Sequence, residues 1–263
     1  VEQDKFEADK KTSAWVLKKI ILPSGGELNI QTESDDYKYV QNKKAMQMFK
    51  VVGAGDNKTP IASTSNTANL FSNQKNPSDY IYVKVSDDSL SSSEFINKYL
   101  SENINKPIYF KFLLKMNSSS KDFVSGYFEI DTDIAKRATM GVSNGMAAIP
   151  LKLLKIDGLV GGNRKVNPIS KAGWGFGRTY LNRAVYGSDG SESNKSFIGI
   201  VNELVGSLKS MTEVFKSPNG LLETKGCAQV FDTNSSWVRL ENPNGKKLGG
   251  GLRVKSIQLS DNW

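Results

Sequence analysis

Carboxylates are the acid–base groups that this sequence leaves for catalysis. The chain of 263 residues contains no histidine, which removes the side chain most often used as a general base and as a metal ligand. Its single cysteine, Cys227, can form neither an internal disulfide nor a Cys-based zinc site. Because a nucleophilic thiol needs a base, we expect Cys227 to be a small buried residue.

The acidic pairs Asp35-Asp36 and Asp87-Asp88 are the nearest approach to a carboxylate dyad. Adjacent residues of a strand point to opposite faces of a sheet, so turn or helix-capping roles are favoured for both pairs. A glycoside hydrolase that uses two carboxylates remains open, although no spacing identifies one. We therefore expect no catalytic residue and no enzymatic activity.

Two short motifs resemble ligand-binding loops but lack required residues. Asp131–Asp133 begins like a calcium loop, yet Ala135 and Lys136 stand where an EF-hand needs a ligand and a glycine. Gly173–Arg178 has neither the spacing of a dinucleotide-binding loop nor small residues between its glycines. Those glycines more plausibly let the intervening rings pack where backbone comes close. We expect neither a metal nor a cofactor.

Aromatic side chains offer a different chemistry, the binding of sugar faces. Under this alternative the chain is a surface or periplasmic carbohydrate-binding module. The residues expected to contact a ligand or partner are Tyr37, Tyr39, Trp174, Phe176 and Trp237.

The formal net charge of +8 favours anionic partners such as nucleic acid, lipid headgroups or acidic glycans. The lysines are scattered, however, and no nucleic-acid motif accompanies them. We interpret the excess as a solvated basic surface and expect no nucleic-acid partner. No apolar run approaches the length of about 18 residues that a transmembrane helix needs.

The strongest pattern among the elements is an amphipathic helix over Lys195–Lys216. Ser191 or Ser193 can cap its start, and Pro218–Gly220 ends it. Such a helix must bury its apolar stripe against neighbouring strands, and a partner-binding role is the alternative. The apolar residues recur at helical spacing: Phe197, Ile200, Val201, Leu204, Leu208, Met211 and Phe215.

Most of the remaining chain predicts short strands and turns. The first hairpin joins Ala14–Leu22 to Glu27–Thr32 around Pro23–Gly26, and Leu28 and Ile30 share one face of its second strand. The other expected strands are Tyr80–Val85, Pro107–Met116, Phe123–Asp131, Leu151–Ile156, Ala228–Phe231, Trp237–Leu240 and Gly251–Leu259.

Two shorter helices are expected, over residues 41–49 and over Ser89–Leu100, whereas residues 1–13 are expected to be extended or frayed. Together these elements predict an α+β fold. It consists mainly of antiparallel strands and hairpins, with the long amphipathic helix near 195–216. We expect residues 1–263 to form a single domain.

Three groups of residues carry a resemblance to a known family. The first is Leu22–Glu27 leading into Glu33–Phe49, and the second is Asn167–Ala172 followed by Arg178, Tyr180 and Leu181. The third is Gly249–Ile257, with the ending Ser260–Trp263. These groups resemble the SprA (Sov) family, the outer-membrane translocons of the type IX secretion system in Bacteroidetes.

This resemblance implies a structural and transport role without catalytic residues. Proteins of that family are very long single-chain β-barrels through which folded cargo passes, assisted by a PorV-like shuttle and a plug protein. The chain would be a segment of such an outer-membrane protein, located in the outer membrane or on its periplasmic or cell-surface side. Secreted cargo and other translocon subunits would be its partners.

The same resemblance suggests which parts of the chain would belong to the wall of the β-barrel. The first hairpin and the last strand would be wall strands, and the residues between them an inserted segment. A lone slice of wall would expose strand edges and a lipid face, so an autonomous inserted domain is favoured.

The pattern over Lys195–Lys216 predicts that Leu204→Asp unfolds the protein. A charge placed on the buried stripe would lack a partner, which is among the most destabilising single changes. Thermal unfolding followed by circular dichroism checks this expectation. If the variant melts like the wild type, the helix is peripheral and its stripe instead awaits a partner.

Overall fold

The computed structural model describes residues 3–72, 76–157, 163–180, 222–223 and 226–260. The helix expected over 195–216 lies outside these residues. Contacts divide the chain into two compact units, which we call the terminal unit (Val1–Met48 with Leu240–Trp263) and the central unit (Phe49–Arg239). The regular secondary structure of the described chain is mostly antiparallel strand, with few helices, which confirms the coarse fold class. The division into two units does not test whether the chain forms a single α+β domain, which stays a prediction.

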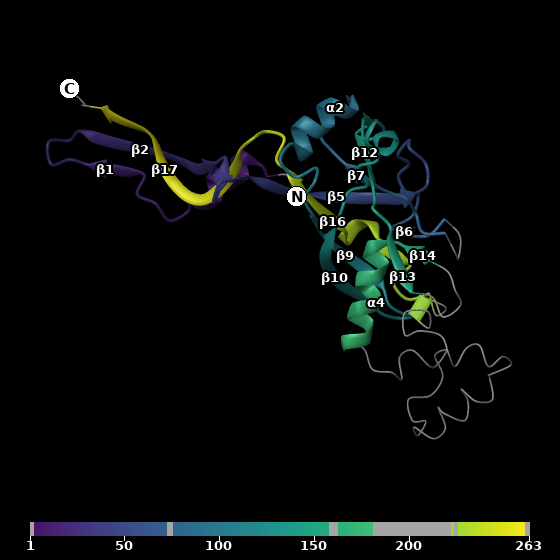
Figure 1. Cartoon of the computed structure of the whole chain (residues 1–263). Helices are drawn as coiled ribbons and strands as arrows, with labels where there is room; N and C mark the ends of the chain where they lie inside the picture. Colours follow the sequence, from purple (N-terminus) through teal and green to yellow (C-terminus); the bar gives the residue numbers. More distant parts are fainter. Residues whose placement is uncertain (1–2, 73–75, 158–162, 181–221, 224–225, 261–263) are drawn as a thin grey trace, which may run out of the picture. The chain divides into compact units, whose positions relative to one another are not determined.

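The terminal unit is built on a three-stranded antiparallel sheet in the order β1-β2-β17 (Figure 1). The expected first hairpin is confirmed, with β1 (Lys19–Ile21) and β2 (Glu27–Tyr37) closed by a turn in which Gly25 has φ 89°. β17 (Lys247–Ser260) is longer than the expected final strand and pairs with β2 over almost its whole length.

Residues 1–13 were expected to be extended or frayed, and this prediction was wrong for α1 (Lys5–Thr12). The Asp4 side chain caps the helix by accepting a hydrogen bond from the Glu7 backbone N–H at 3.0 Å. Glu7 in the first turn and Lys10 and Lys11 in the last turn complement the helix dipole. No residue of α1 is buried, so polar contacts rather than apolar packing hold it.

The helix expected over residues 41–49 was also wrong. The chain there forms a small hairpin of β3 (Tyr39–Val40) and β4 (Lys43–Lys44), followed by β5 (Met46–Gly55). Gln41 and Asn42 have φ angles of 49° and 64°, which suits a two-residue hairpin turn. Along β5, burial alternates at Phe49, Val51 and Gly53, a period of two that outweighs the partial helical spacing.

The larger sheet has ten strands among the described residues, in the order β6-β15-β9-β16-β5-β7-β12-β11-β8, with β10 paired to β9. The expected hairpin of β9 with β10 is confirmed, as are β7, β15 and β16. The bounds of the strands not yet given are β6 Thr67–Asn69, β7 Tyr80–Lys84, β8 Ser89–Leu90, β9 Ile108–Lys115, β10 Lys121–Phe128, β11 Val142–Ser143, β12 Met146–Pro150, β15 Val230–Asp232 and β16 Trp237–Glu241.

The smaller elements complete the described chain. The helix expected over Ser89–Leu100 is confirmed from Ser92 onward, as α2 (Ser92–Phe95) continuing into the π-helix η1 (Ile96–Leu100). A capping box of Ser91 and Glu94 starts it. The strand expected over Leu151–Ile156 begins later in the structure. The remaining elements are α3 Ile134–Arg137, β13 Leu154–Asp157, β14 Asn163–Val166, α4 Pro168–Tyr180 and η3 Thr233–Ser235.

Part of the core of the central unit lies between α4 and the sheet, and another part is formed by Phe95, Tyr99 and Leu100 of α2 and η1. Alternate residues of β9 are buried from Ile108 to Leu114. Trp174 on α4 is fully buried, and its indole N–H donates to the carbonyl of Cys227 at 2.8 Å. Cys227 is buried as expected, and burial raises its pKa to about 11. Gly173–Arg178 is therefore part of a packed helix.

The close packing of α4 predicts opposite effects for two neighbouring glycines. A Cβ at Gly173 would lie 2.3 Å from Cβ of Ala228 and 2.8 Å from Leu114. Gly173→Ala should therefore lower the free energy of unfolding by about 1–3 kcal/mol. At Gly175 a Cβ would meet only the end of the Arg178 side chain at 4.0 Å, so Gly175→Ala should be neutral or stabilising by up to about 1 kcal/mol.

Urea unfolding of the two variants measures this difference directly. Equal destabilisation by both substitutions would contradict the packing of α4 against Ala228.

Candidate functional site

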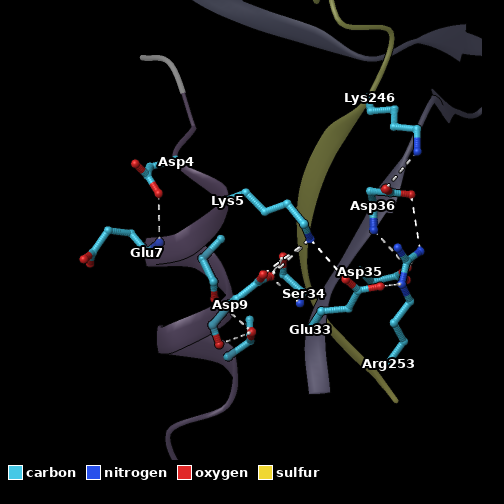
Figure 2. Close-up of polar contacts among 12 residues, drawn as sticks. Asp4, Lys5, Glu7, Asp9, Glu33, Ser34, Asp35, Asp36, Lys246 and Arg253 are labelled. Atoms are coloured by element: carbon cyan, nitrogen blue, oxygen red, sulfur yellow. Dashed lines mark hydrogen bonds and ion pairs between the residues drawn. The ribbon is translucent and has the colours of Figure 1, made fainter. Parts of the chain in front are cut away.

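A network of charged side chains ties together the elements of the terminal unit (Figure 2). We call it the charged cluster, and it comes from α1, β2, β17 and the residue before β17. Its members are Lys5, Asp9, Glu33, Asp35, Asp36, Lys246 and Arg253.

Asp9 fastens α1 to β2 through Ser34. The same carboxylate oxygen accepts the Ser34 backbone N–H at 2.8 Å and its hydroxyl at 2.6 Å. Ser34 is fully buried, so both donors are satisfied by the helix rather than by water. These hydrogen bonds hold the pKa of Asp9 below its ordinary value. Lys5 lies 3.4 Å from both Asp9 and Glu33.

Arg253 links β17 to β2 through its contacts with acidic residues of β2. Its Nε donates to Glu33 at 2.8 Å, and Nη1 lies 3.5 Å from Asp36. The hydrogen bond from Arg253 lowers the pKa of Glu33, and the one from Lys246 at 3.2 Å lowers that of Asp36. Hydrogen bonding to Glu33 in turn raises the pKa of Arg253.

The charged cluster suits a structural clasp better than catalysis. Its four carboxylates face three cations, and the lowered pKa values keep Asp9, Glu33 and Asp36 ionised at neutral pH. A general acid or base instead needs a pKa near the working pH. Within the residues that the structure describes, no group of three or more Asp, Glu or Cys side chains is placed to hold a metal ion.

The same sheet presents an apolar face along β2 and β17. The register places Ile20 and Leu259 on either side of Leu28, and Ile257 opposite Ile30. Leu259 and Ile257 are 62% and 59% exposed. Val254 and Leu252, opposite Thr32 and Ser34, extend this row and are also exposed. We call these seven apolar residues the apolar face of the terminal sheet.

The opposite face of the terminal sheet is mostly polar. Asn29 stands between Lys19 and Gln258, and Glu27 stands between Ile21 and Ser260. Ile21, 68% exposed, is the exception on this side. A sheet that is polar on one face and exposes a contiguous apolar face on the other marks an interaction surface.

The predicted ligand contacts are not gathered at this sheet. Tyr37 ends β2 half-buried, and Tyr39 on β3 is 56% exposed. Trp237 is half-buried on β16, and Phe176 packs on Tyr180 of α4 with ring centroids 4.9 Å apart.

Trp174 is fully buried, so a carbohydrate-binding surface could not use it. Its burial matches the expectation that the glycines around it let the ring pack. Its ring fills the core, because the glycine at 173 lets α4 approach Ala228 closely. Trp174 and Phe176 are two positions apart along the helix, so their rings project from different sides of α4. They cannot form one stacking surface.

The sequence reasoning missed both the charged cluster and most of the apolar face. Leu28 and Ile30 were placed on one face, and that alternation was the available signal. Of the other apolar residues, Ile20 comes from β1 and the rest come from β17, whose alternation is interrupted at Lys255. No sequence signal links Asp9 or Glu33 to Arg253, more than 200 residues further along the chain.

Comparison with known proteins identifies no relative: no protein-family model, curated protein or solved structure matches the chain. Of the helices that the structure describes, none combines the length and apolar character needed to cross a bilayer.

The Asp9–Ser34 contact predicts a measurable pKa change. In Ser34→Ala the carboxylate loses its hydroxyl donor, so the pKa of Asp9 should rise toward its ordinary value. Carboxyl titration by NMR checks this. Ser256→Ala, which removes an exposed hydroxyl bonded to Gln31, is the matched control and should leave Asp9 unchanged.

The sign of the pH effect follows from the direction of the shift. A pKa lowered by folding adds stability at neutral pH, and that contribution is lost as the pH falls through the folded-state pKa. Acid unfolding of Ser34→Ala should therefore begin at a higher pH than in the wild type. An unchanged Asp9 titration would show that this contact is absent in solution.

Proposed function

We propose that this chain is a segment of an outer-membrane protein-export channel of the type IX secretion kind, with a structural and transport role and no catalysis. The observation that carries the proposal is the composition of the terminal sheet. Leu22–Glu27 and Gly249–Ile257, two of the stretches that resemble the SprA family, lie in one sheet as the β1–β2 hairpin and β17.

The two faces of the terminal sheet support this role. Strands of a channel wall alternate between residues that face lipid and residues that face a wet interior. The apolar face, with Leu259, Ile257 and Val254 more than half exposed, suits contact with acyl chains. The opposite face, with Asn29, Gln258 and Ser260, suits a water-filled passage.

The strand order supports the same reading. β1 and β17 are the two edges of the terminal sheet, and β17 pairs only with β2 in the described part of the chain. An exposed edge of this length is ordinarily paired or covered in a finished protein. In a channel wall, each edge would continue into the next strand.

The central unit fits an insertion within such a wall. Its residues, 49–239, lie in sequence between the two resembling strands and form a compact unit of their own. Secreted cargo, a PorV-like shuttle and a plug protein are the proposed partners.

Two neighbouring positions on β17 test the assignment of faces. Ile257→Cys and Gln258→Cys are made in the protein expressed from its own gene, and each thiol is labelled with an environment-sensitive fluorophore in isolated membranes. Cys227 is buried with a raised pKa and should react slowly. Nitroxide-bearing lipids should quench the label at 257, and aqueous iodide should quench the label at 258.

The outcome separates the proposal from its rivals. Equal quenching at both positions by iodide would show that the apolar face does not contact lipid. Recovery of the protein in the soluble fraction would overturn the membrane assignment altogether.

A further inference from the structure

One face of the central sheet carries aromatic rings interleaved with cations. It is formed by β10, β9 and the first residues of β16, all within the central unit. We call it the ring–cation face, and its members are Phe123, Tyr127, Tyr109, Lys111, Trp237 and Arg239.

Strand register brings these residues together. Tyr127 stands opposite Tyr109, and their rings meet edge to face with centroids 5.6 Å apart. Lys111, two residues further along β9, stands opposite Trp237 on β16. Two adjacent rows of the sheet therefore each place a cation next to aromatic rings.

This face points away from the core of the central unit. The alternate residues of β9 and β10 pack inward, where Gly126 lies near Phe110 and Ala172 of α4. Phe123 and Tyr127, on the outward side, are 48% and 61% exposed. The described elements thus leave these two rings open to solvent.

The cations of the ring–cation face lack carboxylate partners in the described part of the chain. Lys111 Nζ lies 4.7 Å from the ring centroid of Phe123, and Arg239 Cζ lies 4.8 Å from that of Tyr109. The Arg239 Nε is buried and has no hydrogen-bond partner. By contrast, Lys121 at the end of β10 is paired with Asp232 at 2.9 Å.

We propose that the ring–cation face binds an acidic polysaccharide. The C–H faces of sugar rings can pack on the exposed aromatics, while carboxylates of the polymer pair with Lys111 and Arg239. The net charge of +8 attracts such a polyanion from a distance. The proposal is independent of the channel role and stands or falls separately.

Two other anionic partners fit this face less well. Proteins that bind single-stranded nucleic acid follow the phosphate backbone with a cationic groove, whereas this face offers two cations, Lys111 and Arg239, each set against a ring. Protein interfaces are depleted in lysine, and their centres are depleted in charge, whereas Lys111 lies between Trp237 and the β10 strand. A polymer that offers both apolar C–H surfaces and carboxylates uses all the groups present.

The test is calorimetric titration of the full chain with oligogalacturonate as the carboxylated probe. Binding should weaken with added salt, and Trp237→Ala or Lys111→Gln should each reduce the affinity by about tenfold or more. Matched controls are Tyr180→Ala, an exposed ring on α4, and Lys165→Gln, an exposed lysine on β14. Both should bind like the wild type, and all variants should show the wild-type far-UV spectrum.

Each alternative outcome overturns the proposal in its own way. Equal affinity for the methyl-esterified oligomer would show that the carboxylates are not recognised. Binding of oligo(dT) that is lost in the same two variants would make the partner a nucleic acid. No binding of oligogalacturonate, or equal losses in variants and controls, would remove the ring–cation face as a glycan site.

Discussion

The antiparallel pairing of β2 with β17 is the interaction on which the terminal unit depends. It joins residues 27–37 to residues 247–260 and so closes a loop of about 200 residues. Loop-closure entropy grows only slowly with length, so a long ladder of backbone hydrogen bonds can offset it. The charged cluster strengthens the same pairing, because Arg253 reaches Glu33 across the two strands and Asp9 holds Ser34 of β2.

Irregularities in the register between β17 and β2 decide which side chains lie on each face of the terminal sheet. β17 shifts register between Leu248 and Leu252 and again between Val254 and Ser256. A bulge adds one residue to one strand, and one added residue reverses the faces of all side chains beyond it. Val254 and Ile257, three residues apart, therefore share the apolar face. Without the extra residue, Ile257 and Leu259 would join the polar side and the sheet would lose its two-faced character.

The two proposed interaction surfaces, the apolar face of the terminal sheet and the ring–cation face, are assembled in the same way. In each, a strand register rather than a loop or a cleft assembles the surface, from residues that are distant in sequence. The terminal sheet separates apolar from polar side chains, whereas the ring–cation face mixes rings with cations on one side of β9, β10 and β16. Both proposals use such sheet faces as surfaces for extended partners. Four carboxylates of the terminal unit, Asp9, Glu33, Asp35 and Asp36, belong to the charged cluster.

The sequence by itself determined the hairpins, because alternating apolar residues and Gly- or Asn-rich turns are local signals: β1 with β2, and β9 with β10. It also predicted the burial of Cys227 and showed that the chain has few acid–base groups, since it contains no histidine and a single cysteine. Tertiary structure alone decided that residues 41–49 are strand and that Arg253 meets Glu33. Those outcomes depend on partners up to 220 residues apart, and neither propensity nor periodicity carries information about contacts at that separation.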